Sequence, residues 1–394
     1  MQTDNMEILQ DIKVCQDKVR GSLFGGAVGD ALGYPVEFWD EESIFSEYGE
    51  YGIQEYELDG QSGRALISDD TQMMLFTANG ILVADARASM NETRDALHNY
   101  LPMSYQDWLR TQEMSFEESR KQPSGYRKGG VSWLLGVPEL YNLRDPGYTC
   151  MSELRQQKNG KSASGSFIAN PKNDSKGCGG IMRVAPLALK SYPHMQIKDI
   201  DREGAEIAAI THGHSLGYMT AAVLVHIIHR IVYPGKPRTL KEVVIEAEAT
   251  VAEIFAGDEH LKELSDITNL SIRLSENGKK DLDNIHQIGE GWVAEETLGI
   301  AIYCSLRHQD DFSAGVTAAV NHNGDSDSTG AVTGNILGAF LGYNAIDEKW
   351  KINLELSDVI LEIADDLCHS CQMSAYSQDK DPNWIRKYMQ WRDE

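Results

Sequence analysis

Apolar residues recur with a spacing close to 3.6 along most of the chain, which is the period of helices that bury one face. Clear examples are the stretches 218–232, 292–306 and 332–341. Alternation with a period of two, bounded by turn residues, is hard to find. The pattern therefore predicts an all-α protein, and because no Pro/Gly/Ser-rich linker separates two apolar halves, we expect a single compact domain over residues 1–394.

Three polar stretches interrupt this pattern, at 112–127, 144–176 and 257–291. The middle one contains Gly160-Lys161-Ser162-Ala163-Ser164-Gly165 and has the composition of a loop. Loops of this length tend to carry function in compact proteins. The sequence does not assign a role to the segments 112–127 and 144–176.

Two series of glycines repeat every four residues, at 21, 25, 29 and 33 and again at 330, 334, 338 and 342. Each glycine inside a helix costs about 1 kcal/mol relative to alanine, so such a stripe needs a reason. Close approach of two helix backbones accounts for both series. Their neighbours add a functional interpretation, because Asp30 and Glu37 accompany the first stripe and Asp325 and Asp327 precede the second.

The chain has 36 Lys and Arg against 60 Asp and Glu, a net charge of −24 at pH 7. This charge argues against nucleic acid and against an anionic membrane surface as partners. We expect no secretory signal, because residues 1–7 lack both a basic region and an apolar run, and no apolar run approaches the ~18 residues of a membrane span. Six scattered cysteines do not form a disulfide framework, so we expect a cytoplasmic protein.

Two segments combine carboxylates and hydroxyls at the expected starts of helices. They are Ser68-Asp69-Asp70-Thr71 and Gly324-Asp325-Ser326-Asp327-Ser328-Thr329-Gly330. Each is explained by helix capping alone. Together they offer an all-oxygen ligand set, which Mg²⁺, Mn²⁺ or Ca²⁺ prefers. An EF-hand is excluded, because the second segment has no Glu at the twelfth position.

Two further segments have weaker signals. Ser175 to Arg183 is a glycine-rich turn before an apolar helix, which could offer backbone N–H groups to an anion, although it is not a P-loop. Thr211-His212-Gly213-His214 precedes another apolar helix. Two histidines without a nearby third ligand favour hydrogen bonding or capping over metal binding. No Gly-x-Ser-x-Gly elbow supports a serine hydrolase.

Taken together and in this order, the motifs resemble the ADP-ribosylglycohydrolase family, which includes dinitrogenase-reductase-activating glycohydrolases and ADP-ribosylarginine hydrolases. The matching segments span residues 21–345 and are 21–33 with Glu37, 68–71, 177–183, 211–212, 291–296 and 324–330. Cys178 stands where many members have Asn in a Gly-Asn-Gly motif.

The resemblance implies an all-α fold with a cleft that holds two metal ions, usually Mg²⁺, with Mn²⁺ as an alternative. The implied metal ligands are Ser68, Asp69, Asp70, Asp325, Asp327 and Ser328, with Thr329 as a substitute for Ser328. The implied catalytic residues are Glu37, Asp69, Asp70 and Asp325. The implied substrate-binding residues are Ser175, Gly177, Gly179, Gly180, Met182, Arg183 and His212.

The activity implied by the resemblance is removal of ADP-ribose from a modified protein, with ADP-ribosyl-arginine as the favoured linkage. Such a reaction passes through an oxocarbenium-like state and needs an oriented water and a base. The partners would be an ADP-ribosylated protein and the ADP-ribose product. Alternatives are ADP-ribosyl-serine or O-acetyl-ADP-ribose as substrate, or ADP-ribose binding without catalysis.

Overall fold

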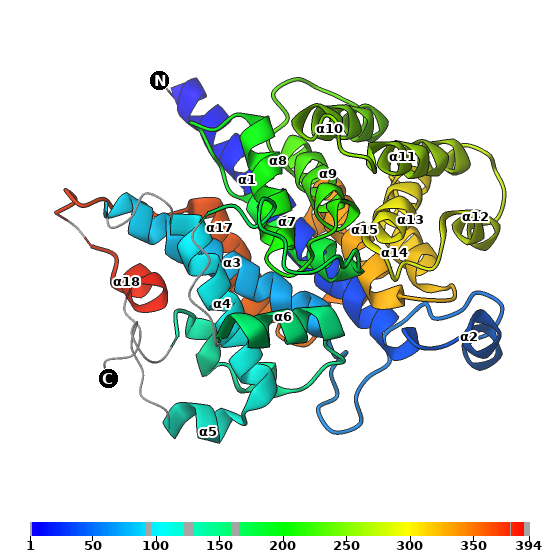
Figure 1. Ribbon diagram of the computed structural model, residues 1–394, viewed down its shortest axis with the longest axis horizontal. Coiled ribbons are helices and arrows are strands. Elements are labelled where there is room, and N and C mark those ends of the chain that lie inside the picture. Colours follow the sequence, from blue (N-terminus) through cyan, green and yellow to red (C-terminus); the bar gives the residue numbers. More distant parts are fainter. Residues whose placement is uncertain (1, 92–95, 122–129, 159–164, 379, 390–394) are drawn as a thin grey trace.

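Two helices that are far apart in the sequence, α1 and α15, lie against each other in the middle of the computed structural model (Figure 1). The structure describes residues 2–91, 96–121, 130–158, 165–378 and 380–389, and the side chains from residue 13 onward. Within these ranges there is no β-strand, as the apolar periodicity predicts. Two isolated bridges join Ala65 to Leu354 and Gly177 to Val293.

The α-helices follow one another along the chain. They are α1 (Gln2–Gly33), α2 (Glu41–Tyr48), α3 (Asp69–Ser89), α4 (Ala96–Glu113), α5 (Phe116–Lys121), α6 (Tyr148–Lys158), α7 (Ala185–Leu189), α8 (Ile197–Ala209), α9 (Ser215–Val232), α10 (Leu240–Ile254), α11 (Leu261–Ser275), α12 (Asp281–Ile288), α13 (Ala294–Arg307), α14 (Phe312–Val320), α15 (Ser326–Leu341), α16 (Glu348–Lys351), α17 (Ser357–His369) and α18 (Pro382–Tyr388). Short 3₁₀ helices cover Tyr34–Val36, Trp133–Gly136, Pro138–Tyr141, Cys178–Arg183 and Tyr343–Ala345.

The two glycine stripes form the interface between α1 and α15. A Cβ atom on Gly29 would lie 1.9 Å from the Gly330 carbonyl oxygen, and one on Gly334 would lie 2.0 Å from the Gly25 carbonyl oxygen. The same close contact joins Gly21 to Gly338, so the two helices run antiparallel. Close backbone approach, predicted from the sequence, is therefore confirmed, and the missing side chains offset the intrinsic cost of glycine in a helix.

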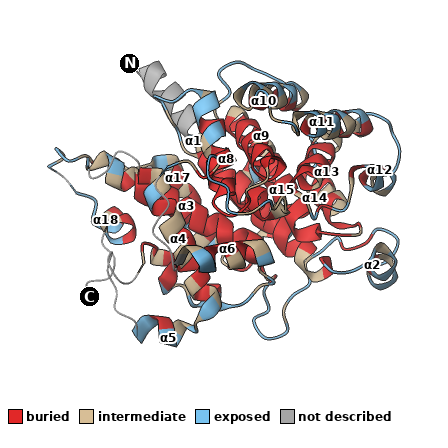
Figure 2. Ribbon diagram, in the orientation of Figure 1, coloured by how far each residue is buried: buried red, intermediate tan, exposed pale blue. Residues whose placement is uncertain are grey.

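Other helices surround this pair and bury most of their apolar faces (Figure 2). The main core is continuous from Val19 to Tyr388, and a smaller cluster lies where α11 and α12 meet α13. Every residue of α9 except Arg230 is buried. By length and composition alone α9 could cross a membrane, but the core helix of a folded protein meets the same criterion.

The polar stretches contain more helix than their composition suggests. Within 144–176, α6 buries Met151 and Leu154 against its neighbours, so tertiary packing outweighs loop-like composition. Residues 159–164 of this stretch, and 122–127 of the stretch 112–127, lie outside the described residues. The glycine-rich segment also differs from the expectation, because it enters a 3₁₀ helix, Cys178–Arg183, before the short α7.

Candidate active site

The first acidic segment caps α3. Ser68 is the N-cap residue, and its Oγ accepts a hydrogen bond from the Asp70 amide at 3.2 Å. Asp30, on α1, accepts hydrogen bonds from the backbone amides of Ser68 at 2.9 Å and Thr71 at 3.0 Å. Asp30 therefore fixes the start of α3 to α1, a role that a carboxylate at a helix N-terminus performs well.

The second acidic segment caps α15. Asp325 is the N-cap residue and accepts from the Ser328 amide at 3.3 Å, while Asp327 accepts from the same amide at 2.9 Å. The Thr329 hydroxyl donates to the carbonyl oxygens of Ala319 and Asp325, so it is already engaged away from these carboxylates. Ser328, which is buried, is therefore better placed than Thr329 to offer an oxygen ligand.

The glycine-lined contact of α1 with α15 brings the acidic residues together. A Cβ atom on Gly33 would lie 2.3 Å from the Ser326 carbonyl oxygen, so the end of α1 meets the start of α15. Glu37 follows α1 after one short 3₁₀ turn. As a result, one carboxylate oxygen each from Glu37, Asp325 and Asp327 lies within 4.8 Å of the others.

We call Glu37, Asp69, Asp70, Asp325 and Asp327 the acidic centre. All five are buried, with side chains between 3% and 8% exposed. Asp69 and Asp70 are not in the three-carboxylate group, but both interact electrostatically with Asp327. The structure therefore places the predicted acids of both segments and Glu37 in one region of the molecule.

Burial and repulsion among neighbouring carboxylates dominate the electrostatics of the acidic centre. Burial, together with the nearby charges of Asp327 and Asp325, raises the pKa of Glu37 to about 11. The pKa values of Asp69, Asp70 and Asp325 lie well above their usual range for the same reasons. Glu37 Oε2 and Asp70 Oδ2 are buried without a hydrogen-bond partner among the described residues. Such a group of acids needs protons or cations to remain buried.

The glycine-rich segment lies over His212. A Cβ atom on Gly179 would lie 3.0 Å from His212 Cε1, and one on Gly177 would lie 3.4 Å from His212 Nε2. Ser175 Oγ accepts from the Gly177 amide at 3.4 Å. The ring nitrogen Nδ1 of His212 pairs with Thr211 Oγ1 at 2.9 Å, and burial lowers the pKa of His212 to about 3, so the ring is neutral.

Met182 and Arg183 face the core, which differs from their expected position along the substrate. Both are buried, and the Arg183 guanidinium lies 4.5 Å from the centre of the Tyr105 ring and donates to Thr211 Oγ1 at 2.7 Å. These contacts hold Arg183 behind the glycine-rich segment, so the structure supports a positioning role and not direct substrate contact. Gly180 likewise packs against Ala208.

The segment around Trp292 connects the glycine-rich loop to the acidic centre. The Cys178 amide donates to the Trp292 carbonyl at 3.3 Å, and the Cys178 thiol donates to Asp325 Oδ2 at 2.8 Å. Glu296 accepts from the Glu290 and Gly291 amides, and the Glu290 carbonyl accepts from the Asp325 amide at 2.9 Å. The residue in the place of the usual Asn thus contacts a proposed metal ligand directly.

Sequence reasoning missed an aromatic pair beside the acidic centre. Phe38, next to Glu37, stacks on Trp292 with ring centroids 5.9 Å apart and an angle of 19° between the planes. The two residues are 68% and 40% exposed, which is costly for large rings unless something covers them. The sequence places each of these residues beside a site motif, which could have drawn attention to them. That they contact each other is visible only in the folded structure.

The second histidine of the segment 211–214 has a structural partner. His214 is the N-cap of α9 and accepts from the Leu216 amide at 3.1 Å, which confirms the expected capping role. Two histidines within α9 are also hydrogen-bonded: His226 pairs with Asp201 at 2.8 Å, and His229 Nδ1 lies 2.9 Å from the Ala188 carbonyl.

Comparisons with known proteins agree with this architecture. The family model described as ADP-ribosylglycohydrolase matches residues 12–376. The chain is 23% identical to the ADP-ribosylhydrolase ARH3 of Bos taurus over 367 residues, which cover 86% of this chain and 88% of that one. It is also 23% identical to the ADP-ribosyl-[dinitrogen reductase] glycohydrolase of Rhodospirillum rubrum over 344 residues, covering 86% and 91%.

A solved structure supports the fold independently. The structure described as an ADP-ribosylglycohydrolase-related protein complex superimposes with a TM-score of 0.59 and 24% identity, covering 91% of this chain and 99% of the other. The fold, the ordered motifs and the family match lead to one conclusion: the chain belongs to the ADP-ribosylglycohydrolase family and is a glycosidase that hydrolyses ADP-ribosyl bonds.

Proposed function

We propose that this enzyme removes ADP-ribose from modified arginine side chains of proteins, by hydrolysing the N-glycosidic bond with the help of two divalent cations, preferably Mg²⁺. The observation that carries the proposal is the group of three carboxylates from Glu37, Asp325 and Asp327, whose oxygens lie within 4.8 Å of one another. Hard divalent cations prefer ligand sets of this kind.

The chemistry of the donors fits a cation. Every group in the acidic centre offers oxygen, two of the buried carboxylate oxygens have no partner among the described residues, and the raised pKa values reflect uncompensated negative charge. Ser68, Asp69, Asp70, Asp325, Asp327 and Ser328 would hold the ions. When bound, divalent cations would orient the ribose hydroxyls or a water molecule and lower the pKa of that water.

The residues of the site would then have different roles in catalysis and in substrate binding. Glu37 is the residue of the acidic centre outside the set proposed to hold the ions, and its Oε2 has no partner among the described residues. Its carboxylate would therefore accept a proton from the attacking water once positive charge nearby restores its ionised form. The acids would also stabilise positive charge that develops on the ribose ring. Gly177 and Gly179, which pack against His212, would bind along the ADP-ribose together with that histidine.

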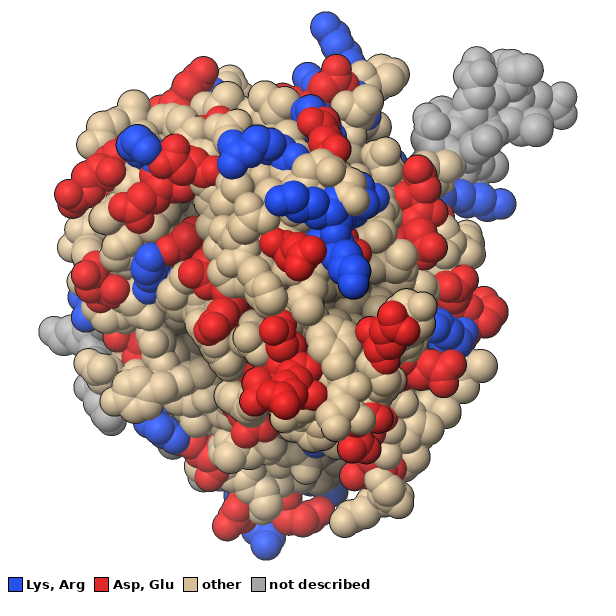
Figure 3. Space-filling model, turned by 90° about the vertical axis from the view of Figure 1, so that its right-hand side faces the viewer, with Lys and Arg blue, Asp and Glu red and all other residues tan. Residues whose placement is uncertain are grey.

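Arginine is the favoured linkage because of the surroundings of the acidic centre. A guanidinium is a flat cation that pairs with carboxylates and stacks on aromatic faces. Phe38 and Trp292 present such faces next to Glu37, and Figure 3 shows groups of acidic side chains distributed over one face of the molecule. The Rhodospirillum rubrum relative is named for removing ADP-ribose from a protein, dinitrogen reductase, which supports a protein substrate. A cytoplasmic location is part of the same proposal.

The test is release of free ADP-ribose from an ADP-ribosylarginine protein, with Mg²⁺, with Mn²⁺ and with a chelator. We expect release with Mg²⁺, loss with the chelator and recovery when Mg²⁺ is returned. Full release by chelated, dialysed protein would exclude the metal-dependent mechanism.

A second set of substrates tests the linkage. ADP-ribosyl-serine protein and O-acetyl-ADP-ribose share the ADP-ribose but lack the guanidinium. We expect ADP-ribosyl-arginine to have the highest kcat/KM, and a higher value for either of the others would replace arginine as the substrate. Binding of ADP-ribose without turnover of any member of the panel would support the binding-only alternative.

A further inference from the structure

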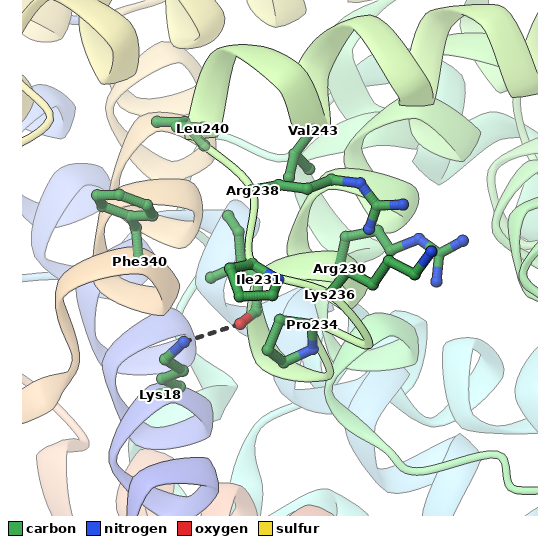
Figure 4. Close-up of a pocket in the computed structure, with 10 residues that line it drawn as sticks. Lys18, Arg230, Ile231, Pro234, Lys236, Arg238, Leu240, Val243 and Phe340 are labelled. Carbon is green, nitrogen blue, oxygen red and sulfur yellow. Dashed lines mark hydrogen bonds between the residues drawn. The ribbon is translucent and has the colours of Figure 1, made fainter.

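A second charged region lies at the other end of α15 from the acidic centre, against the middle of α1. It is a cavity of about 150 Å³ between the middle of α1, the end of α9, the start of α10 and the end of α15 (Figure 4). Lys18, Arg230, Lys236 and Arg238 contribute four positive side chains to its lining, and none of its lining residues is acidic. We call this cavity the basic pocket.

The positive charge of the basic pocket is only partly neutralised. Arg230 and Arg238 share one carboxylate, Glu246, with nitrogen–oxygen distances of 3.0 Å each. Lys18 donates to the Ile231 carbonyl at 2.9 Å, and Asp17 acts on it electrostatically. Lys236 is exposed and forms no ion pair within the described part of the chain. Glu242 also acts electrostatically on Arg238, and Asp201 on Arg230. Lys236 is therefore the lining cation without an acidic partner among the described residues, in a chain whose net charge is −24.

The remaining lining of the basic pocket is apolar. Phe340 and Ile231 lie on the α1 side, and Figure 4 shows the head groups of Arg230, Lys236 and Arg238 gathered on the opposite side. A cavity of about 150 Å³ has room for a single aromatic ring. The pocket therefore combines a place for a small apolar body with several donors for an anion, and guanidinium groups suit phosphate in particular.

We propose that the basic pocket binds a small organic phosphate, with its apolar body against Phe340 and its phosphate among Arg230, Lys236 and Arg238. This site is separate from the acidic centre, because Lys18 and Gly33 are 15 residues apart on α1, a distance of roughly 22 Å along a helix. It does not depend on which ADP-ribosyl linkage the enzyme cleaves.

The experiment is calorimetric titration of the full-length protein with phenyl phosphate, in the presence of Mg²⁺ and saturating ADP-ribose so that the catalytic site is filled. We expect the double variant Lys236→Glu/Arg238→Glu to raise the dissociation constant at least about tenfold, because it reverses two charges in the pocket. Lys279→Glu/Lys280→Glu makes the same charge change at exposed positions outside the pocket lining and should bind like the wild type.

A second variant tests the apolar part. Phe340→Leu should weaken phenyl phosphate about threefold or more and leave inorganic phosphate unchanged. The proposal is overturned by absence of binding to wild-type protein, by equal losses in the two double variants, by displacement with ADP-ribose, or by tighter binding of benzoate than of phenyl phosphate. Thermal unfolding of each variant verifies that it is folded, and Phe340→Leu provides an independent result if the charge reversal disturbs the loop.

Discussion

The acidic centre lies where the end of α1 meets the start of α15, whereas the basic pocket lies against the middle of α1 and the end of α15, and the two are built in opposite ways. The acids lie at the first turns of α3 and α15 and just after α1, and backbone amides donate to three of them, Asp69, Asp325 and Asp327. The cations of the pocket are long side chains, and Lys236 and Arg238 belong to an exposed loop. The acidic centre is therefore buried within the fold, whereas much of the charge of the basic pocket is carried by exposed side chains.

The two regions differ in how their charge is compensated. In the acidic centre, burial gives the carboxylates strongly raised pKa values, so their ionised forms need bound cations. In the basic pocket, pairing with Glu246 and access to solvent already compensate part of the positive charge. We therefore expect changes in the acidic centre to have large effects and changes in the pocket to have moderate, salt-sensitive ones.

The largest effect is expected from Asp325→Ala. Asp325 caps α15 and belongs to the three-carboxylate group, so its loss should reduce turnover more than ~100-fold and abolish Mg²⁺ binding, because even residues behind metal ligands contribute 10–100-fold. ADP-ribose release and calorimetry with Mg²⁺ measure the two effects. Asp85→Asn, which changes an acid paired with Lys190, should leave both unchanged. Near-normal turnover of the Ala variant would remove Asp325 from the site.

The next effect concerns the helices that join the two regions. Gly334→Ala places a Cβ atom 2.0 Å from the Gly25 carbonyl oxygen, so α1 and α15 must move apart. We expect a loss of about 3 kcal/mol in the free energy of unfolding, measured by urea denaturation. Gly60→Ala meets no atom within 4 Å and should change stability by less than ~0.5 kcal/mol. Equal stability of the two variants would show that the helices do not need this close contact.

The pH dependence of the metal-free protein gives a smaller effect. The folded pKa of Glu37, about 11, exceeds its ordinary value of 4.5. Its contribution to stability is therefore complete below pH 4.5 and is lost as the pH rises towards 11. With chelator, the unfolding temperature should fall from pH 6 to pH 9, and more steeply for the wild type than for Glu37→Gln. Added Mg²⁺ should flatten the wild-type curve; identical slopes for both proteins would contradict the shift.

Much of the fold was predictable because its signals are local. Helical periodicity identified α9, α13 and most of α15, and the glycine stripes predicted a close helix contact without saying which helices meet. Helix α6 was hidden because its polar composition outweighs the few residues that it buries. Its formation depends on packing against α4, a contact that periodicity cannot reveal.

The motifs of the candidate site could be predicted from the sequence, but the directions in which their side chains point could not. Ser68 and Asp325 are at helix starts, where their residue types favour them. The sequence does not show that Arg183 turns inward onto Tyr105, because that partner belongs to the distant helix α4. Phe38 and Trp292 are likewise brought together only by the fold.

The smallest effect tests whether the acidic centre and the basic pocket act independently. Lys236→Glu/Arg238→Glu should leave kcat/KM for ADP-ribosyl-arginine protein within about twofold of wild type in ~0.15 M salt, because a Debye length of ~8 Å screens exposed charges and the pocket lies far along α1 from Glu37. Turnover measured with and without phenyl phosphate checks this for both the variant and the wild type. A larger fall in the variant, at unchanged thermal stability, would mean that the helices transmit the state of the basic pocket to the acidic centre, and the two regions would then have to be treated as one coupled system.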